Sequence, residues 1–317
     1  MKPNQSSDDS DLSLLALFQF LWEQKFWLVS IPFTVTVIAA AWTLTIPDTY
    51  RSDTLLAPTE EAQGAGLKNM VGQFGGLASI AGINLDSDNA DNVTVAIAIL
   101  KSRLFAKNVI AKYDLAVPLV AATGWDRESN TLIIDEQQYD PLTNEWVRKN
   151  EPLRPSVPSD QELYERYVEI LQIERDQVNG LITVSVEFFS PVLSKNWLEA
   201  MIFEINEEMR NREMLSSQQN IEYLQSKVEE LDNIEMVKIF YQLIEQETKD
   251  LMLAEVTKDY VFRTLDPPVV AIKKYAPSRS LICLVVAFLS GFLILLGYIA
   301  AFLLFPHLGT DKAQRRG

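Results

Sequence analysis

Two long stretches without a charged residue lie near the two ends of the chain. The first, 26–46, has 21 residues with Pro32 as its only helix breaker, and the second, 281–305, has 25 residues. At 1.5 Å per residue they would form helices of roughly 31 and 37 Å, about the thickness of the hydrocarbon core of a bilayer. Aromatic residues flank the first stretch on both sides, as in the interfacial belts of membrane helices. We therefore expect transmembrane helices over 26–46 and 281–305.

A cleaved signal peptide is the alternative for the first stretch. Its apolar run is too long for a signal sequence, and the segment before it is acidic, with Asp8, Asp9 and Asp11. Ile46-Pro47-Asp48 is also a poor cleavage site. These features favour a retained span.

The two spans divide the chain into a tail of residues 1–25, a central segment 47–280 and a tail 306–317. The net charge of −15 comes from 43 acidic and 28 basic residues. Of these, 38 acidic and 23 basic residues lie in the central segment, so the tails of −2 and +2 cancel. The basic residues beside the second span do not decide the orientation, because they are equally numerous on both sides. From the acidic excess we predict that the central domain lies outside the membrane and that both short tails lie inside.

The composition excludes several functions. A strongly acidic chain is a poor partner for nucleic acid, because a phosphate backbone selects basic surfaces. A single Cys and a single His cannot form a disulfide within the chain, a Cys/His zinc site or a Cys–His nucleophile pair. No P-loop motif occurs, and the glycine-rich run 72–82 lacks the lysine of a phosphate cradle, so we read it as a loop. We expect no catalytic, cofactor-binding or metal-binding residues, and we interpret Cys283, His307 and the paired glutamates of the helical region as structural.

The central segment has the pattern of a mixed α/β domain. Strands are predicted over 50–57 and 181–189, where β-branched and aromatic residues gather, and a small hairpin over 131–135 and 145–147. Helices are predicted over 92–113 and from 161 to about 170, the latter capped by Ser159-Asp160.

The 75 residues from Val192 to Asp266 contain neither Gly nor Pro. Ser190-Pro191 reads as the N-cap and first turn of a long helix. The run predicts either one continuous helix of roughly 110 Å or two helices that turn near 231–233. The apolar seam of this arm is narrow, which favours packing between subunits over a plain hairpin within one chain. The predicted seam consists of Ile221, Leu224, Val228 and Leu231.

Several segments follow the first span in a fixed order. They are Tyr50-Arg51-Ser52-Asp53-Thr54-Leu55-Leu56-Ala57-Pro58, the helix with Leu100-Lys101-Ser102-Arg103, the long helix, and Asp266-Pro267-Pro268 with Pro277-Ser278-Arg279 before the last span. In this order the segments resemble the Wzz chain-length determinant family, the class of polysaccharide co-polymerases that regulate O-antigen length. The chain departs from the family at Ala271, where another proline is common.

The resemblance implies a fold and a function. The implied fold is an α+β membrane protein, in which two transmembrane helices flank a periplasmic α/β base with a long extended helical arm within 191–266. The implied function is the control of chain length of a lipid-linked polysaccharide, such as the O-antigen of lipopolysaccharide, with a Wzy-type polymerase. The protein would act in the bacterial inner membrane as a ring-like homo-oligomer, and it would make or break no bond itself.

A further group of candidate residues lies at and within the second span. Pro267 and Pro268 would end a sheet strand, because proline cannot donate to the ladder, and Pro277 and Arg279 would start the second span. These prolines could set a stiff angle between the base and the membrane, or they could form a simple linker between strand and helix. The sequence favours neither interpretation. Gly291, Gly297 and Ala301 lie within the span, and the four-residue spacing of Gly297 and Ala301 permits close approach of another helix.

Two other classes of function stay open. One is a scaffold for capsule or exopolysaccharide export, whose kinase would be a separate chain. The other is a periplasmic sensor, against which the short tails count.

Overall fold

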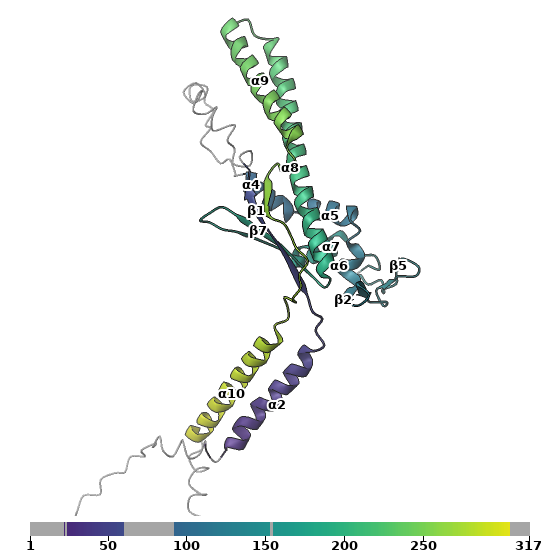
Figure 1. The fold of residues 1–317 in the computed structure, drawn as a ribbon, viewed down its shortest axis with the longest axis vertical. Coiled ribbons are helices and arrows are strands. Elements are labelled where there is room, and N and C mark those ends of the chain that lie inside the picture. Colours follow the sequence, from purple (N-terminus) through teal and green to yellow (C-terminus); the bar gives the residue numbers. More distant parts are fainter. Residues whose placement is uncertain (1–21, 23, 60–91, 153–154, 305–317) are drawn as a thin grey trace, which may run out of the picture. The chain divides into compact units, whose positions relative to one another are not determined.

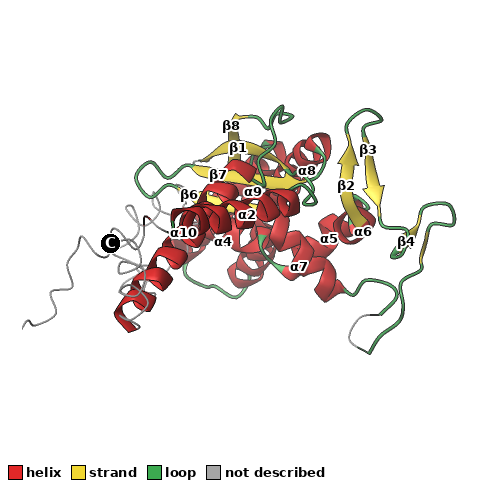
Figure 2. Ribbon diagram, turned by 90° about the horizontal axis from the view of Figure 1, so that it is seen from below, coloured by secondary structure: helices red, strands yellow, loops and turns green. Residues whose placement is uncertain are grey.

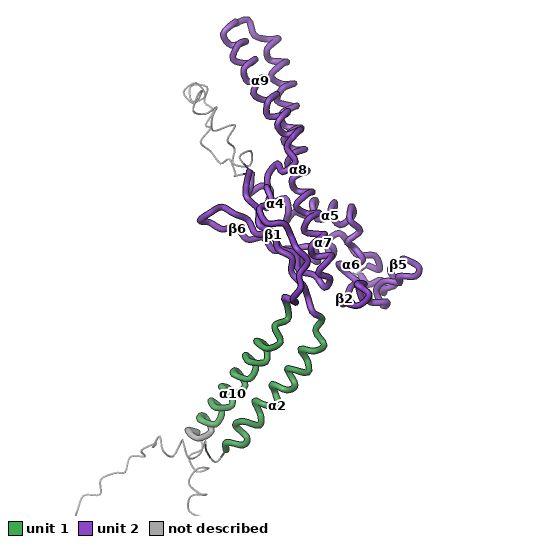
Figure 3. The backbone as a smooth tube through the Cα atoms, viewed as in Figure 1, with its two compact units in different colours: residues 1–47, 276–317 green, residues 48–275 purple. Residues whose placement is uncertain are grey.

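The computed structural model describes residues 22, 24–59, 92–152 and 155–304. The glycine-rich run 72–82 and His307 therefore lie outside the described residues. The chain forms two compact units, one of residues 1–47 and 276–317 and the other of residues 48–275 (Figure 3).

The first unit contains two helices, α2 (Lys25–Thr43) and α10 (Arg279–Leu304), which lie side by side (Figure 1). By length and composition both can cross a membrane. Pro32 lies inside α2 without ending it. The hydroxyls of Thr34 and Thr36 donate to carbonyl oxygens one turn earlier, at 2.8 and 2.7 Å. These bonds satisfy the hydroxyl groups of an otherwise apolar helix.

The second unit is built on a four-stranded antiparallel sheet in the order β6-β7-β1-β8 (Figure 2). β1 is a central strand although it is the first in sequence, and its neighbour β8 is the last. The bounds are β1 (Tyr50–Pro58), β6 (Leu171–Arg175), β7 (Ile182–Phe188) and β8 (Phe262–Asp266).

One face of this sheet is apolar and the other is polar. On the apolar face, Leu56 of β1 lies opposite Ile182 of β7, and both side chains are fully buried. The side chains that alternate with them point to the other face, where Arg51 lies opposite Glu187 and Asp53 opposite Ser185. The apolar face packs against the first half of the long helix, so the core of the unit lies between the sheet and that helix.

Four shorter helices complete the base. They are α4 (Asn92–Leu100), α5 (Arg103–Lys112), α6 (Ala116–Ala121) and α7 (Asp160–Ile170). The prediction of one helix over 92–113 was wrong, because the chain turns at Lys101-Ser102. There the Ser102 hydroxyl accepts a hydrogen bond from the Phe105 amide at 3.2 Å and starts a new helix. Ser159 caps α7 in the same way, as predicted.

The predicted hairpin of 131–135 with 145–147 was also wrong. Both segments form hairpins, but with other partners. β3 (Thr131–Ile134) pairs with β2 (Ala122–Asp126), and β5 (Glu145–Trp146) pairs with β4 (Tyr139–Asp140). In both cases the partner is the segment immediately before it in sequence, across a short polar turn.

The run without glycine or proline forms two helices, α8 (Pro191–Val228) and α9 (Ile234–Val256), which pack side by side as a hairpin (Figure 1). Ser190 caps α8 with Pro191 in the first turn, as predicted. Asn233 caps α9, where its side-chain oxygen accepts from the amides of Glu235 and Met236. The mixed α/β base, the long helical arm and the two flanking apolar helices confirm the predicted fold class.

Asn206 ties the long helix to the edge strand of the sheet. Its side chain is buried, and its oxygen accepts hydrogen bonds from the amides of Val261 and Phe262, both at 2.9 Å. Its amide nitrogen donates to the carbonyl oxygen of Phe262 at 3.0 Å. One side chain thus takes the place of a neighbouring strand at the start of β8.

Replacement of Asn206 by Leu is expected to lower the free energy of unfolding of the second unit by about 2–4 kcal/mol. Three hydrogen bonds are lost and three backbone groups stay buried without those partners. Denaturant unfolding of the purified protein, followed by the fluorescence of the buried Trp197, measures the effect. Gln218→Leu on the exposed surface of α8 is the control, and an equal change in both variants would contradict this role of Asn206.

Candidate functional site: the link to the second span and the helical arm

The chain leaves the sheet at two prolines. β8 ends at Asp266, immediately before Pro267 and Pro268, which have no amide hydrogen to continue the ladder. The buried hydroxyls of β1 take over the contact. Thr54 donates to the carbonyl oxygen of Asp266 at 2.7 Å, and Ser52 donates to that of Val269 at 2.9 Å. The linker is therefore held along β1 by side chains rather than by backbone pairing.

The end of this linker returns to the start of β1. The Tyr275 amide donates to the carbonyl oxygen of Thr49 at 2.8 Å, and Lys274 pairs with Asp48 at 3.2 Å. The two chain segments that lead to the apolar helices are thus joined to each other. We refer to residues 266–275 with the β1 residues that hold them as the return linker.

Arg51 organises the polar face of the sheet beside the return linker. Its guanidinium donates to Asp53 at 2.6 Å, to Ser185 at 2.8 Å and to Gln172 at 3.2 Å. It also donates to the hydroxyl of Tyr275 at 3.1 Å and lies over the ring of that tyrosine. Arg51 therefore connects three strands and the return linker through one side chain. Arg51 was not among the candidate residues predicted from the sequence. Its position next to Ser52 in a predicted strand was a usable signal, because neighbouring side chains of a strand point to opposite faces of the sheet.

In the first unit, Pro277 and Arg279 lie at the start of α10. The peptide bond before Pro277 is cis, and the Arg279 amide donates to the Pro277 carbonyl oxygen at 2.9 Å. The Arg279 guanidinium donates to the carbonyl oxygen of Ile46 at 3.3 Å, just beyond the end of α2. This contact links the two apolar helices at one end.

Gly291 and Gly297 lie inside α10, and neither makes a close helix contact within the chain. A methyl group built on either glycine would meet no atom within 4 Å. Contact between α2 and α10 therefore does not require these glycines, and their role in helix packing stays a prediction.

The structure places the predicted seam on the α8–α9 hairpin. Ile221, Leu224, Val228 and Leu231 are all half-buried. Since α9 packs along α8, the chain itself supplies part of the cover that a neighbouring subunit was expected to provide. The turn is at 229–233, close to the predicted 231–233. Packing between subunits stays a prediction.

A polar layer lies in the middle of the same hairpin. Asn220 of α8 donates to Glu247 of α9 at 3.3 Å, and Ser217 is buried. Burial raises the pKa of Glu213 above its usual 4.5, and the carboxylates of Asp250 and Glu247 raise it further. The hairpin therefore carries a carboxyl group whose charge opposes packing.

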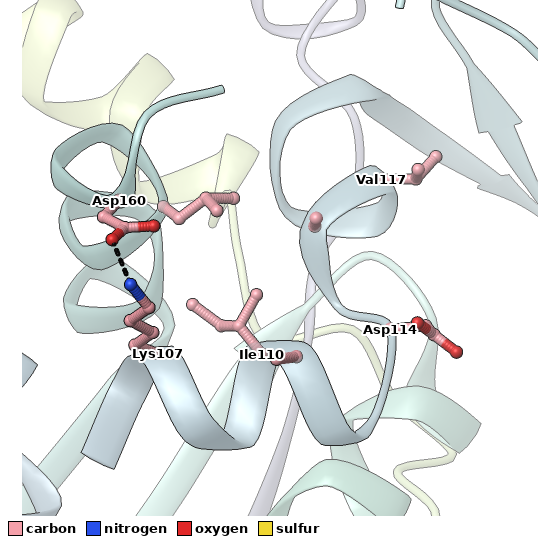
Figure 4. Close-up of a pocket in the computed structure, with 8 residues that line it drawn as sticks. Lys107, Ile110, Asp114, Val117 and Asp160 are labelled. Carbon is pink, nitrogen blue, oxygen red and sulfur yellow. Dashed lines mark hydrogen bonds and ion pairs between the residues drawn. The ribbon is translucent and has the colours of Figure 1, made fainter. Parts of the chain in front are cut away.

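Two cavities open on the base. One of about 310 Å³ lies between α5, α6 and α7, and the Lys107–Asp160 ion pair of 2.6 Å closes one side of its mostly apolar wall (Figure 4). The other, of about 390 Å³, includes Thr49 and Glu187 and has a mixed polar wall. Among the residues that the structure describes, no group of three or more His, Cys, Asp or Glu side chains has the arrangement of a metal site.

Part of the chain matches a known protein family. Residues 10–113 match the family described as Wzz, chain length determinant protein. This segment contains α2, β1, α4 and α5, and it includes the Tyr50–Pro58 and Leu100–Arg103 motifs. No curated protein matches the chain.

Two examples illustrate the similarity of the chain to solved structures. One is a fragment of WzzB, a polysaccharide co-polymerase from Salmonella Typhimurium, with 16% identity and a TM-score of 0.31 over 73% of this chain and 100% of that one. The other is a full-length bacterial polysaccharide co-polymerase, with 13% identity and a TM-score of 0.34 over 91% of this chain and 98% of that one. At such scores neither similarity bears on how the parts of this chain are arranged.

The family match covers about the first third of the chain and relates that part to polysaccharide chain-length determinants. The resemblance predicted from the sequence is thereby confirmed over residues 10–113, which match the Wzz chain length determinant family.

Replacement of Arg51 by Lys is expected to destabilise the base by about 1–3 kcal/mol. Lysine keeps the charge, but a single ammonium group cannot reach the partners of the planar guanidinium. Thermal unfolding in detergent, compared with Arg263→Lys on the exposed edge strand, measures the difference. Equal melting temperatures for the two variants would show that the Arg51 contacts contribute nothing.

Replacement of Glu213 by Gln is expected to stabilise the arm at neutral pH. Because the folded-state pKa of Glu213 is raised, its stabilising neutral form is fully present below about pH 4.5 and is lost as the pH rises through the raised value. The gain in melting temperature should therefore be present at pH 7 and absent near pH 4. Glu255→Gln, at an exposed position on α9, is the control. The same gain at both pH values would contradict the titration of Glu213.

Proposed function

We propose that this protein regulates how far a Wzy-type polymerase extends a lipid-linked surface polysaccharide, the O-antigen of lipopolysaccharide. It acts as a homo-oligomer in the bacterial inner membrane, with residues 47–280 in the periplasm and both tails in the cytoplasm. The chain is a regulator and forms or breaks no glycosidic bond. The observation that carries this proposal is the family match of residues 10–113, which covers the first apolar helix and the central strand of the base.

The architecture supports a regulatory role on physical grounds. The second unit is bounded by two helices that can cross a membrane, and the return linker brings its two ends together at Thr49 and Tyr275. A domain held in this way remains next to the membrane, where a lipid-linked polymer grows. The arm presents a helical surface that a neighbouring copy can contact.

Deletion of the gene tests the function directly. We expect polymer synthesis to continue with a broadened length distribution, because the chain is not the polymerase. The ladder of surface polysaccharide on a gel is the measurement. Complete loss of polymer would favour the export-scaffold alternative, and an unchanged ladder in cells that express the gene would refute length control of that polymer.

Replacement of Ile221, Leu224 and Val228 together by Gln should broaden the ladder in the same way. Each half-buried side chain contributes roughly 1 kcal/mol to packing of the arm, less than the 1.5–3 kcal/mol of a fully buried one. The control is replacement of the exposed Glu229 and Glu230 by Gln, which should change stability by at most about 0.5 kcal/mol and leave the ladder intact. A blot must show equal protein levels. A normal ladder from the triple variant would exclude a role for this seam in length control.

A further inference from the structure

The cavity of about 390 Å³ lies in the second unit and includes Thr49, the second residue of that unit. Thr49 lines it and is only five positions after Leu44, the C-cap of α2. At about 3.6 Å per residue, the chain cannot place Thr49 more than ~18 Å from that end of α2. The backbone bond from Tyr275 to Thr49 fixes the approach to α10 at the same point. We call this cavity the membrane-end pocket.

The wall of the membrane-end pocket combines several kinds of hydrogen-bonding group. α7 contributes Arg166 and Glu169, which form an exposed ion pair at 2.8 Å, and Gln138 lies before β4. Glu187 at the end of β7 accepts a hydrogen bond from the Thr49 hydroxyl at 2.6 Å. The half-buried Phe189 adds an aromatic ring. The pocket thus offers carboxylate acceptors, guanidinium and amide donors, a hydroxyl and one apolar surface.

These groups keep capacity for a ligand although they already contact one another. A carboxylate has about four acceptor positions and a guanidinium five N–H donors, so one internal bond leaves several available. A sugar ring presents hydroxyls that both donate and accept, together with an apolar C–H face that suits an aromatic ring. The volume lies within the range of about 300–1,000 Å³ that is usual for small-ligand pockets.

Charge decides which ligand fits. Two carboxylates and one guanidinium give the pocket wall a net negative charge, which disfavours a phosphate headgroup or an acidic sugar. The other cavity has an apolar wall of Ile110, Val117 and Leu163, with charged groups but no aromatic ring or amide beside them (Figure 4). Of the two, only the membrane-end pocket has the mixed wall that a neutral saccharide requires.

We infer that the membrane-end pocket binds a neutral saccharide unit of the polymer, in the part nearest the lipid. This inference rests on the proposed function, since it takes the ligand to be the lipid-linked glycan. The tether of ~18 Å holds the pocket beside the membrane, where the first sugars of such a glycan lie. The pocket would hold the growing polymer by its lipid end while its length is determined.

The test is a titration of the full-length protein in a sugar-free detergent. The probe is the polysaccharide of the source bacterium, released from its lipid by mild acid and cut to a few repeats. Binding is followed by saturation-transfer NMR and calorimetry. We expect binding by the wild-type protein and at least a tenfold weaker affinity for Glu187→Gln and for Arg166→Gln.

Asp160→Asn is the matched control, because it removes an ion pair of similar exposure beside the other cavity. It should bind within twofold of the wild type. Arg166 is half exposed, so its variant stays informative if Glu187→Gln fails to fold. A second arm compares the same saccharide on its lipid in nanodiscs, where tighter binding than that of the free saccharide identifies the lipid-linked form as the ligand.

No binding by the wild type, or equal binding by the pocket variants and the wild type, would overturn the inference. Binding that is lost only in Asp160→Asn would assign the saccharide to the other cavity and would also overturn it. These results are independent of the gene deletion. If deletion broadens the ladder but the pocket variants still bind the saccharide, the inference about the pocket is refuted. The proposed function is then still supported by the deletion.

Discussion

The second unit depends on β1 more than on any other element. The chain enters the unit as β1, which pairs with β7 on one side and β8 on the other. Its buried side chains form part of the core, and its polar side chains form the network around Arg51. A segment that begins seven residues after α2 is thereby fixed in the middle of a sheet. Since β8 and the return linker run back along β1, both ends of the unit meet at one place.

The long helix α8 has two different surroundings. Its buried residues lie between Pro191 and Met209, with Ser217 as the only later one. The first half therefore belongs to the core, where Asn206 fixes it to β8. The second half packs against α9 and contains the polar layer around Glu213. The base is held by full burial of apolar side chains, whereas the arm is held by a narrow seam.

The sequence predicted features that depend on local pattern. Uncharged runs indicated α2 and α10, β-branched runs indicated β1 and β7, and Ser190-Pro191 indicated the start of α8. Pairing between segments was not predictable in the same way. The strand at 131–134 could join any nearby strand, and the local turn after β2 decided its partner. The break at Ser102 was missed because the apolar spacing continues across it while the cap acts on a single turn.

The candidate residues show the same limit. Pro267 and Pro268 stand out in the sequence, but Ser52 and Thr54, whose hydroxyls replace the missing ladder, do not. A proline signals that a donor is missing, whereas the group that takes over the contact is known only once the strands are paired. The same holds for Arg51, whose partners come from 121 to 224 residues further along the chain, apart from Asp53.

The return linker has a physical consequence for the connection to α10. A backbone ladder resists displacement through many parallel bonds, whereas this linker depends on five contacts. They are the hydroxyl bonds of Ser52 and Thr54, the Arg51–Tyr275 contact, the Lys274–Asp48 ion pair and one backbone bond. Each such bond contributes about 1 kcal/mol net, so these contacts together hold the linker on β1 by only a few kcal/mol. The prolines that end the strand thus place a weak connection between a well-packed base and the helix that leads away from it.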